Sequence, residues 1–143
     1  MDQAPMVPIN YIAVLVAALI PMAVGALWYS PALFAKKWMA LVGKTEEEMK
    51  KVNPMKAYGI SFLTSLIMAY CLAHSVEFGS AYMHISGFAS GLQAGFWIWL
   101  GYVVTTNASS VLFEFRPSGL YWMSMGYYFV CLLLMGGLLG AWK

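Results

Sequence analysis

Four long uncharged stretches divide the chain, and nearly every charged residue lies between them or outside them. A membrane hydrocarbon core is about 30 Å thick, so a helix that rises about 1.5 Å per residue needs roughly 20 apolar residues to cross it. Each stretch is about that long, which leaves little of the 143 residues for a soluble core. The pattern predicts an all-α integral membrane protein, a four-transmembrane-helix bundle that forms a single domain over residues 1–143. The predicted spans are residues 9–29, 55–76, 87–108 and 118–142.

The connection between the first two spans, residues 31–53, predicts short interfacial helices. From Pro31 to Val42, helical spacing separates an apolar stripe from the lysines. The stripe consists of Phe34, Trp38, Leu41 and Val42, and the lysines are Lys36, Lys37 and Lys44. Such a stripe either dips below the lipid headgroups or packs on the protein's own helices, and the sequence leaves both open.

A further short helix is predicted to follow Gly43 and to end at Asn53 and Pro54. Thr45 and Glu48 have the spacing of a capping box, in which each residue satisfies a free backbone donor of the other. Oppositely charged residues four apart then predict a solvated, self-paired helix face. These pairs are Glu46 with Lys50 and Glu47 with Lys51.

Basic residues are distributed unequally between the two sides of the predicted bundle. The first connection holds Lys36, Lys37, Lys44, Lys50, Lys51 and Lys56, the third holds Arg116, and the opposite side has Lys143. Because basic residues concentrate in cytoplasmic loops, we expect the 30–56 connection in the cytoplasm and both termini outside. Aromatic rings and lysines beside this connection are expected to anchor the protein at the interface. These anchors are Trp28, Tyr29, Trp38, Lys36 and Lys37.

Composition supports the membrane interpretation and argues against nucleic-acid partners and ion-coupled transport. The chain is 62% hydrophobic and 10% charged, whereas soluble domains average about 25% charged residues. The net charge of +2 is too small to predict a nucleic-acid partner. No charge lies at the middle of a predicted span, although pumps and ion-coupled carriers normally need one. Cys71 and Cys131 lie inside apolar stretches and are expected to be small buried hydrophobic residues.

Small residues recur every four positions in the third span and predict close helix packing. Gly87, Gly91 and Gly95 form this face, and Gly136 with Gly140 give the fourth span a shorter version. Since lipid supplies no hydrophobic force between helices, such close backbone contact is a main source of association. The sequence does not distinguish packing within one chain from packing between subunits, and we expect the former.

Two other positions within the spans are polar or break the helix pattern. Pro21, with Gly25 one turn later, predicts a kink in the first span. Gln93 lies on the side of the third span opposite its glycines, which predicts an interhelical hydrogen bond or a contact to a partner. Thr105 and Thr106 are expected to bond back to the preceding helical turn.

Residues that could carry chemistry are few. His74 and Glu77 share a helix face, with His84 across the next connection, and this set could bind a metal or relay a proton. Ordinary interfacial polar groups are the preferred interpretation. Glu114 should have a cationic partner, which could be Lys36, Lys37 or Arg116, and we expect a structural tie between the two cytoplasmic connections. Nucleophile, phosphate-loop and haem motifs are absent from the sequence, so neither an enzyme nor a cofactor is predicted.

Two sequence blocks carry a family resemblance. The first block is GALWYSP, from Gly25 to Pro31, and the second is FEFRP, from Phe113 to Pro117. With these blocks in this order, the chain resembles the bacterial domain-of-unknown-function 1761 family over almost its whole length. The resemblance implies a four-span protein of the bacterial cytoplasmic membrane with no established activity. It singles out Trp28, Tyr29, Ser30, Pro31, Glu114, Arg116 and Pro117. Ser124 departs from the family pattern, which favours asparagine there.

These observations predict a non-enzymatic accessory or stabilising subunit of a larger or homo-oligomeric membrane complex. Its contacts would come from the glycine face of the third span and the aromatic-rich fourth span, with lipid and other membrane chains or further copies as partners. The alternative is a passive carrier or pore for a small, mostly apolar solute, which requires a continuous cavity between the spans. A membrane enzyme would require His74, Glu77 and His84 to converge.

Overall fold

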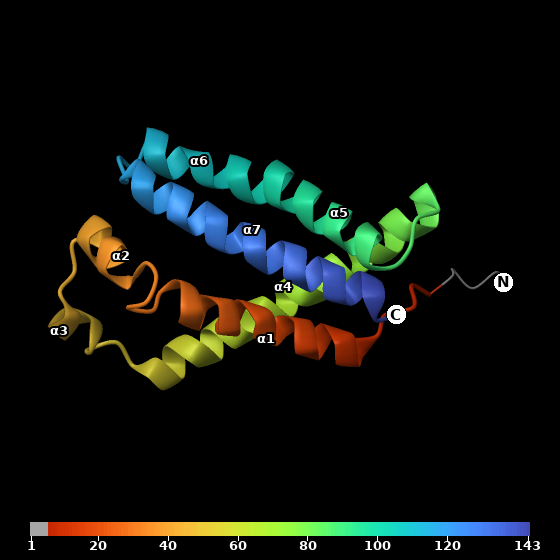
Figure 1. Cartoon of the computed structure of the whole chain (residues 1–143), viewed down its shortest axis with the longest axis horizontal. Coiled ribbons are helices and arrows are strands. Elements are labelled where there is room, and N and C mark those ends of the chain that lie inside the picture. Colours follow the sequence, from red (N-terminus) through yellow and green to blue (C-terminus); the bar gives the residue numbers. More distant parts are fainter. Residues whose placement is uncertain (1–5) are drawn as a thin grey trace.

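The computed structural model describes residues 6–143, and this part of the chain is helical without β-strands (Figure 1). The helices are α1 Tyr11–Trp28, α2 Ala35–Val42, α3 Glu46–Met49, α4 Pro54–Met83, α5 Phe88–Ile98, η1 Trp99–Val104, α6 Thr105–Leu112 and α7 Ser118–Ala141. Within the described residues, α1, α4 and α7 are long and apolar enough to cross a membrane by length and composition. The segment η1 is a π-helix that joins α5 to α6 in one continuous rod beside α7. The all-α prediction is confirmed for the part described.

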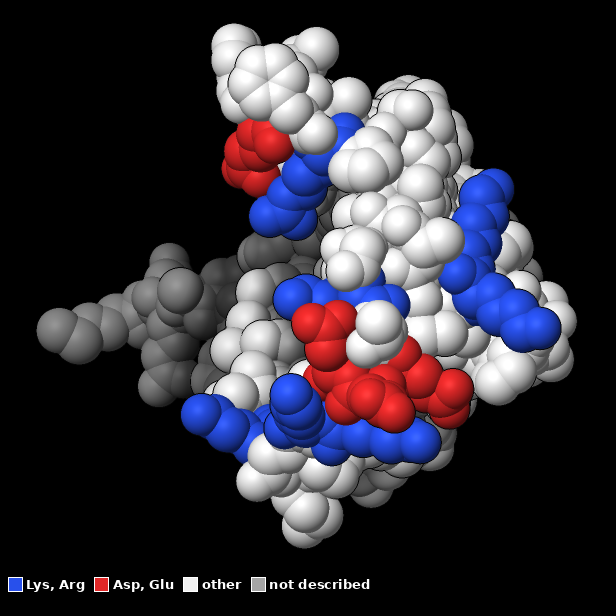
Figure 2. Space-filling view, turned by 90° about the vertical axis from the view of Figure 1, so that its left-hand side faces the viewer, with Lys and Arg blue, Asp and Glu red and all other residues white. Residues whose placement is uncertain are grey.

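The long helices run along one axis, so the bundle has two distinct ends (Figure 1). The short helices α2 and α3, the start of α4 and the end of α6 lie at one end, which we call the lysine end. The start of α1 and the end of α7 lie at the opposite end. Figure 2 shows that lysine, arginine and acidic side chains gather over the lysine end.

Several helix boundaries differ from the prediction. Helix α4 continues to Met83 rather than ending near Val76, and the rod that begins with α5 reaches Leu112 rather than Ala108. Between Val76 and His84 the sequence contains no proline to interrupt the helix, so α4 continues past the predicted end. His84 (φ 55°) then adopts a left-handed conformation that ends α4, and Gly87 (φ 79°) precedes the first residue of α5.

The connection at the lysine end is less helical than predicted. Residues 30–34 form turns, in which the amides of Phe34 and Ala35 donate to the carbonyls of Trp28 and Ser30, and α2 begins four residues after Pro31. Its stripe packs on the protein itself: the Trp38 ring lies edge-on to Tyr29 with centroids 5.8 Å apart, and Leu41 lies against Gly119. Of the two alternatives for this stripe, the structure therefore shows packing on the protein's own helices.

The capping box is confirmed, but the expected ion pairs that follow it are wrong. The Thr45 hydroxyl accepts from the Glu48 amide at 3.2 Å, and the Glu48 carboxylate accepts from the Thr45 amide at 2.9 Å. The Lys50 amide donates to the Glu46 carbonyl at 3.1 Å, so the backbone completes this helical turn, but the ion pairs found among residues 6–143 include neither Glu46 with Lys50 nor Glu47 with Lys51. Glu48 instead pairs with Lys44, at 3.8 Å.

The glycines of α5 and α7 pack within the chain. A Cβ atom added to Gly91 or Gly95 would collide with the α7 backbone, and one added to Gly136 or Gly140 would collide with the α5 end of the rod. The expectation of intrachain packing is therefore confirmed. The same face cannot supply a contact between subunits, so that part of the predicted mechanism is wrong.

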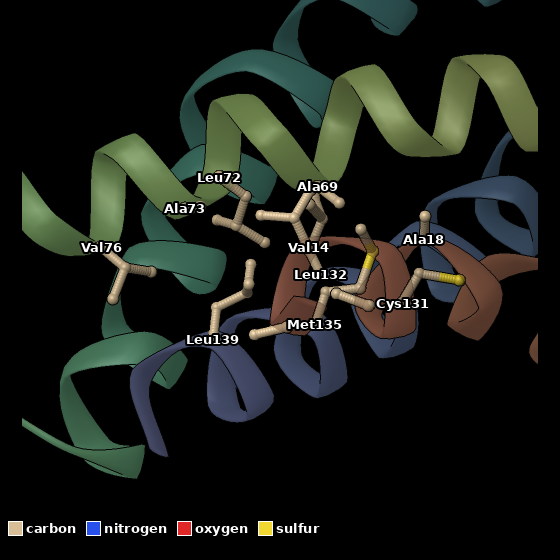
Figure 3. Packing of buried hydrophobic residues seen from close by; sticks show 12 residues of the cluster. Val14, Ala18, Ala69, Leu72, Ala73, Val76, Cys131, Leu132, Met135 and Leu139 are labelled. Atoms are coloured by element: carbon tan, nitrogen blue, oxygen red, sulfur yellow. The ribbon is translucent and has the colours of Figure 1, made fainter. Parts of the chain in front are cut away.

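A buried apolar cluster joins α1, α4 and α7 (Figure 3). It contains Ala13, Val14, Ala17, Ala18, Ala69, Leu72, Ala73, Val76, Cys131, Leu132, Met135 and Leu139. The alanines of α1 and α4 let these helices approach closely, while leucine and methionine side chains of α7 fill the space between them. Cys131 is buried here as predicted, whereas Cys71 is exposed on α4, contrary to the prediction, and both thiols are free.

Candidate functional site

A cleft of about 720 Å³ opens between α1, α4 and α7 in the half of the bundle nearer the lysine end. Pro21, Gly25 and Tyr29 of α1 and its cap form one wall, and Ser61 and Ser65 of α4 form another. Ser124, Tyr127 and Tyr128 of α7 form the third wall, and Trp38 of α2 closes the side towards the lysine end.

The motif residues at the end of α1 build the rim of this cleft. Tyr29, Ser30 and Pro31 line it, and the Ser30 hydroxyl donates to the Leu27 carbonyl at 2.7 Å, which holds the turn after the helix. The Tyr29 ring lies 5.6 Å from the Tyr127 ring, measured between centroids. The Trp-Tyr-Ser-Pro block is therefore positioned to shape a cavity and to seat α2.

Trp28 is not among the residues that line the cleft. Its ring packs against Phe34, with centroids 4.9 Å apart, and fills the space left by Gly126 on α7. Its indole nitrogen is buried and has no hydrogen-bond partner in the described part of the chain. Of the predicted interface anchors, Lys36 and Lys37 are exposed on α2, whereas Trp38 lines the cleft.

Tyr127 links α7 to the proline of α1 at the inner end of the cleft. Its hydroxyl donates to the Pro21 carbonyl at 2.8 Å. The ring also lies over Gly25, where an added Cβ would come to 3.4 Å from the Tyr127 hydroxyl. Helix α1 continues through Pro21, and this hydrogen bond ties the proline turn to the neighbouring helix.

The second family block lies beside a smaller cavity. Arg116, Asn107 and Ser110 line a space of about 250 Å³ that shares Trp38 and Ser124 with the large cleft. The Arg116 guanidinium pairs with Glu114 at 2.9 Å, and both side chains are more than half exposed. Glu114 therefore bonds within its own connection, and the predicted tie to the other connection through this carboxylate is wrong. Pro117 caps the start of α7.

The three candidate ligands near the opposite end do not form a metal site. The His74 ring bonds to the Tyr70 carbonyl at 3.0 Å and lies between Tyr70 and Phe78. Glu77 pairs with Lys143 at 3.0 Å, and His84 is the left-handed residue that ends α4. Within residues 6–143, no group of three or more histidine, cysteine, aspartate and glutamate residues could hold a metal ion. The convergence required for a membrane enzyme is therefore not observed.

Gln93 and its surroundings form a separate surface on the outside of the bundle. Gln93 is exposed on α5, and no side-chain hydrogen bond found among the described residues involves it. It borders a groove of about 220 Å³ between the end of α4 and α5. The small residues Ser75, Gly79, Ser90 and Ala94 line this groove. The predicted interhelical hydrogen bond is not found among residues 6–143.

The sequence patterns did not predict that Ser61 and Ser65 line the cleft. Ser61 and Ser65 stand one helical turn apart on the same face of α4, so both reach the cleft. Two serines four positions apart on one face of a mostly apolar stretch indicate a polar patch, and this signal was present in the sequence. The expected back-bonding of Thr105 and Thr106 is confirmed, since their hydroxyls donate to the carbonyls of Gly101 and Tyr102.

The three helices that are long and apolar enough to cross a membrane indicate the class of helical membrane proteins. The family described as "Protein of unknown function (DUF1761)" has a model that matches residues 12–140, and the chain belongs to this family. The resemblance predicted from the Trp-Tyr-Ser-Pro and Phe-Glu-Phe-Arg-Pro blocks is confirmed. No curated protein and no solved structure matches the chain.

Proposed function

We propose that this protein crosses the bacterial cytoplasmic membrane four times and acts without catalysis, as an accessory subunit that contacts another membrane chain. The fourth crossing is the rod formed by α5, η1 and α6, which have 11, 6 and 8 residues. At a rise of about 1.5 Å per residue the rod is about 37 Å long, enough to span the hydrocarbon core. It carries no charged residue and packs beside α7 (Figure 1).

The proposed orientation follows from the charges. The lysine end holds the basic residues of both longer connections (Figure 2). Among residues 6–143, Lys143 is the lysine or arginine at the opposite end. The positive-inside bias favours the lysine end in the cytoplasm. With four crossings, the start of α1 and the end of α7 then face the outside.

The observation that carries the accessory role is the unpaired amide of Gln93. An amide that faces hydrocarbon without a hydrogen bond costs free energy, and polar side chains within spans usually find a partner on another helix. Gln93 lies about one and a half turns inside α5, which begins at Phe88. A helix from another chain would supply the missing hydrogen bond.

The groove beside Gln93 provides room for such a helix. A Cβ atom added to Gly79 meets nothing within 4 Å, in contrast to the glycines buried between α5 and α7. A neighbouring helix could therefore approach the backbone of α4 closely, which is the geometry that favours helix association in lipid. This surface replaces the glycine face of the third span in the mechanism.

We propose a second copy of this chain as the occupant. A carboxamide has both a donor and an acceptor, so two copies of Gln93 related by a two-fold axis can bond to each other. Trp97, also on the border of the groove, would supply a large apolar side chain to the same interface. Such a contact is self-complementary and closes as a dimer.

Association can be measured by energy transfer between labelled copies diluted into lipid vesicles. Gln93→Leu should weaken the dimer about threefold to tenfold, as expected for one hydrogen bond between membrane helices, and Gly79→Phe should weaken it by filling the groove. Asn107→Leu is the matched control, because the Asn107 amide donates to Val103 of its own helix. A wild-type protein that stays monomeric at every dilution, or a Gln93→Leu variant that associates like wild type, would contradict the proposal.

The packing argues against the alternative of an open pore. The cleft lies in the half of the bundle nearer the lysine end, while alanine, leucine and methionine side chains fill the space towards the opposite end (Figure 3). A solute path through the described part of the bundle would have to open this cluster.

A further inference from the structure

Three serine hydroxyls in the large cleft lack the partner that serines in membrane helices usually have. A serine or threonine inside a membrane helix commonly donates to the carbonyl three or four residues before it. Thr64, Ser75, Thr105, Thr106, Ser109 and Ser110 all do so here. Ser61, Ser65 and Ser124 line the cleft, and none of their hydroxyls makes this backbone bond among the described residues. The Ser124 hydroxyl instead faces the Tyr29 hydroxyl as a hydrogen-bond partner, which leaves Ser61 and Ser65 without a partner in the described part of the chain.

Among these serines, Ser65 is almost completely buried, so its hydroxyl has little access to a partner outside the cleft. Its exposed fraction is 6%, and it lies on the face of α4 that packs towards α1 and α7. Its hydroxyl oxygen is not among the fully enclosed polar atoms without a partner, so it remains open to the cleft. The Ser65 hydroxyl reaches the cleft, so a molecule within the cleft can supply the missing bond.

The walls around the serines are aromatic and uncharged. Tyr29, Trp38, Tyr58, Tyr127 and Tyr128 contribute rings, and none of the residues found to line the cleft is charged. An ionic group would lose its hydration there without gaining a counter-charge. Flat apolar rings favour an uncharged molecule with a substantial apolar body.

The size of the space fits a small lipid-soluble molecule. The cleft holds about 720 Å³, within the range of about 300–1,000 Å³ typical of ligand sites. A neighbouring cavity of about 560 Å³ shares Tyr29, Trp38 and Ser61 with it and extends under α2 towards Met39 and Met49. An apolar chain longer than the cleft itself could continue along this second space.

We propose that the cleft binds an uncharged, membrane-soluble molecule whose carbonyl, ester or hydroxyl oxygens bond to Ser61, Ser65 and Ser124 while its apolar body lies among the tyrosines. Serine hydroxyls both donate and accept, so they suit each of these oxygen groups. The walls come from four segments of the chain that meet only in the folded bundle, and the Tyr127 bond to Pro21 fixes the spacing of two of them. The site does not depend on the Gln93 groove, which lies on a different surface.

This ligand chemistry has two sources in a membrane. Neutral glycerolipids carry ester and hydroxyl oxygens on apolar chains, and lipid-soluble quinones carry ring carbonyls that can also stack on aromatic side chains. We therefore use two probes, dioleoylglycerol and a benzoquinone with a decyl chain. Preferential binding of the first points to the bilayer's own lipids, and preferential binding of the second points to a diffusible ring compound.

The experiment measures binding of each probe to the full chain in detergent micelles by native mass spectrometry. Wild type should bind one molecule of at least one probe. The double variant Ser61→Ala, Ser65→Ala should lower the affinity at least about tenfold, because two hydrogen bonds are removed. Thr64→Val is the matched control on the same helix, since its exposed hydroxyl bonds back to Ser61 and does not line the cleft.

Two further variants keep the test independent of folding defects in α4. Ser124→Ala removes the hydroxyl on α7 and should weaken binding alone, by a few fold. Ala26→Phe places a ring at the exposed rim of the cleft and should abolish binding. The proposal is overturned if neither probe binds to wild type, or if the serine variants bind as tightly as wild type and Thr64→Val, as they would if the cleft held only water.

Discussion

The backbones of Gly91 and Gly136 lie in direct contact: a Cβ atom on either residue would sit under 3.0 Å from the carbonyl oxygen of the other. Both helices therefore need glycine at the point where they touch. This contact, with Gly95 and Gly140 beside it, fixes the position of the α5 end of the rod against α7.

Gly91→Ala should lower the free energy of unfolding, because the backbone of α7 must move to admit a methyl group. Overpacking of this kind typically costs about 1–3 kcal/mol. Equilibrium unfolding in mixed detergent micelles measures the loss. Gly59→Ala on α4 is the control, since a Cβ there meets nothing within 4 Å. Equal stability of the two variants would show that α5 and α7 do not approach so closely.

Tyr127→Phe removes the hydroxyl that donates to Pro21 and keeps the ring against Tyr29. The same unfolding measurement should show a loss of about 0.6 kcal/mol, with about 1.7 kcal/mol as an upper value, as found for hydrogen bonds between membrane helices. Tyr82→Phe is the matched control, because Tyr82 is 88% exposed. A Tyr127→Phe variant as stable as this control would show that the hydroxyl does not join α7 to α1.

Glu77 connects α4 to the end of α7 through Lys143, whose ammonium also donates to Ser80 at 2.9 Å. Glu77→Gln should reduce stability by no more than about 1 kcal/mol, because both side chains are partly exposed. The reduction should shrink as salt is added, since salt screens the pair. Glu46→Gln, at an exposed position of α3, is the control. A loss that does not change with salt would mean that Glu77 acts through packing instead.

Much of the fold follows from local patterns that the sequence displays directly. Uncharged stretches of the right length located α1, α4, α7 and most of the rod, and the Thr45 and Glu48 spacing located the start of α3. Helix ends were harder to predict because they depend on backbone conformation. His84, which ends α4 with a left-handed conformation, is not a residue type that normally signals such a stop.

The site was less predictable, because it depends on which helices become neighbours. The Tyr29, Ser30 and Pro31 block indicated a position of interest, but its cleft forms only when α2 folds back over Tyr29 and α7 brings Ser124 across. The glycine pattern indicated close packing without identifying the partner helix. Glu114 pairs with Arg116, two residues away, and this pairing depends on the loop conformation around Phe115 (φ 54°).

The number and direction of membrane crossings are the central claim, and labelling of single cysteines in intact cells tests them most directly. In a chain with Cys71 and Cys131 replaced by alanine, a membrane-impermeant thiol reagent should reach cysteines at Ser86 and Lys143 from outside. Cysteines introduced at Lys50 and Phe115 should react only after the cells are permeabilised. Labelling of the Phe115 position from outside would show that the rod of α5, η1 and α6 does not cross, and external labelling at Lys50 would invert the orientation.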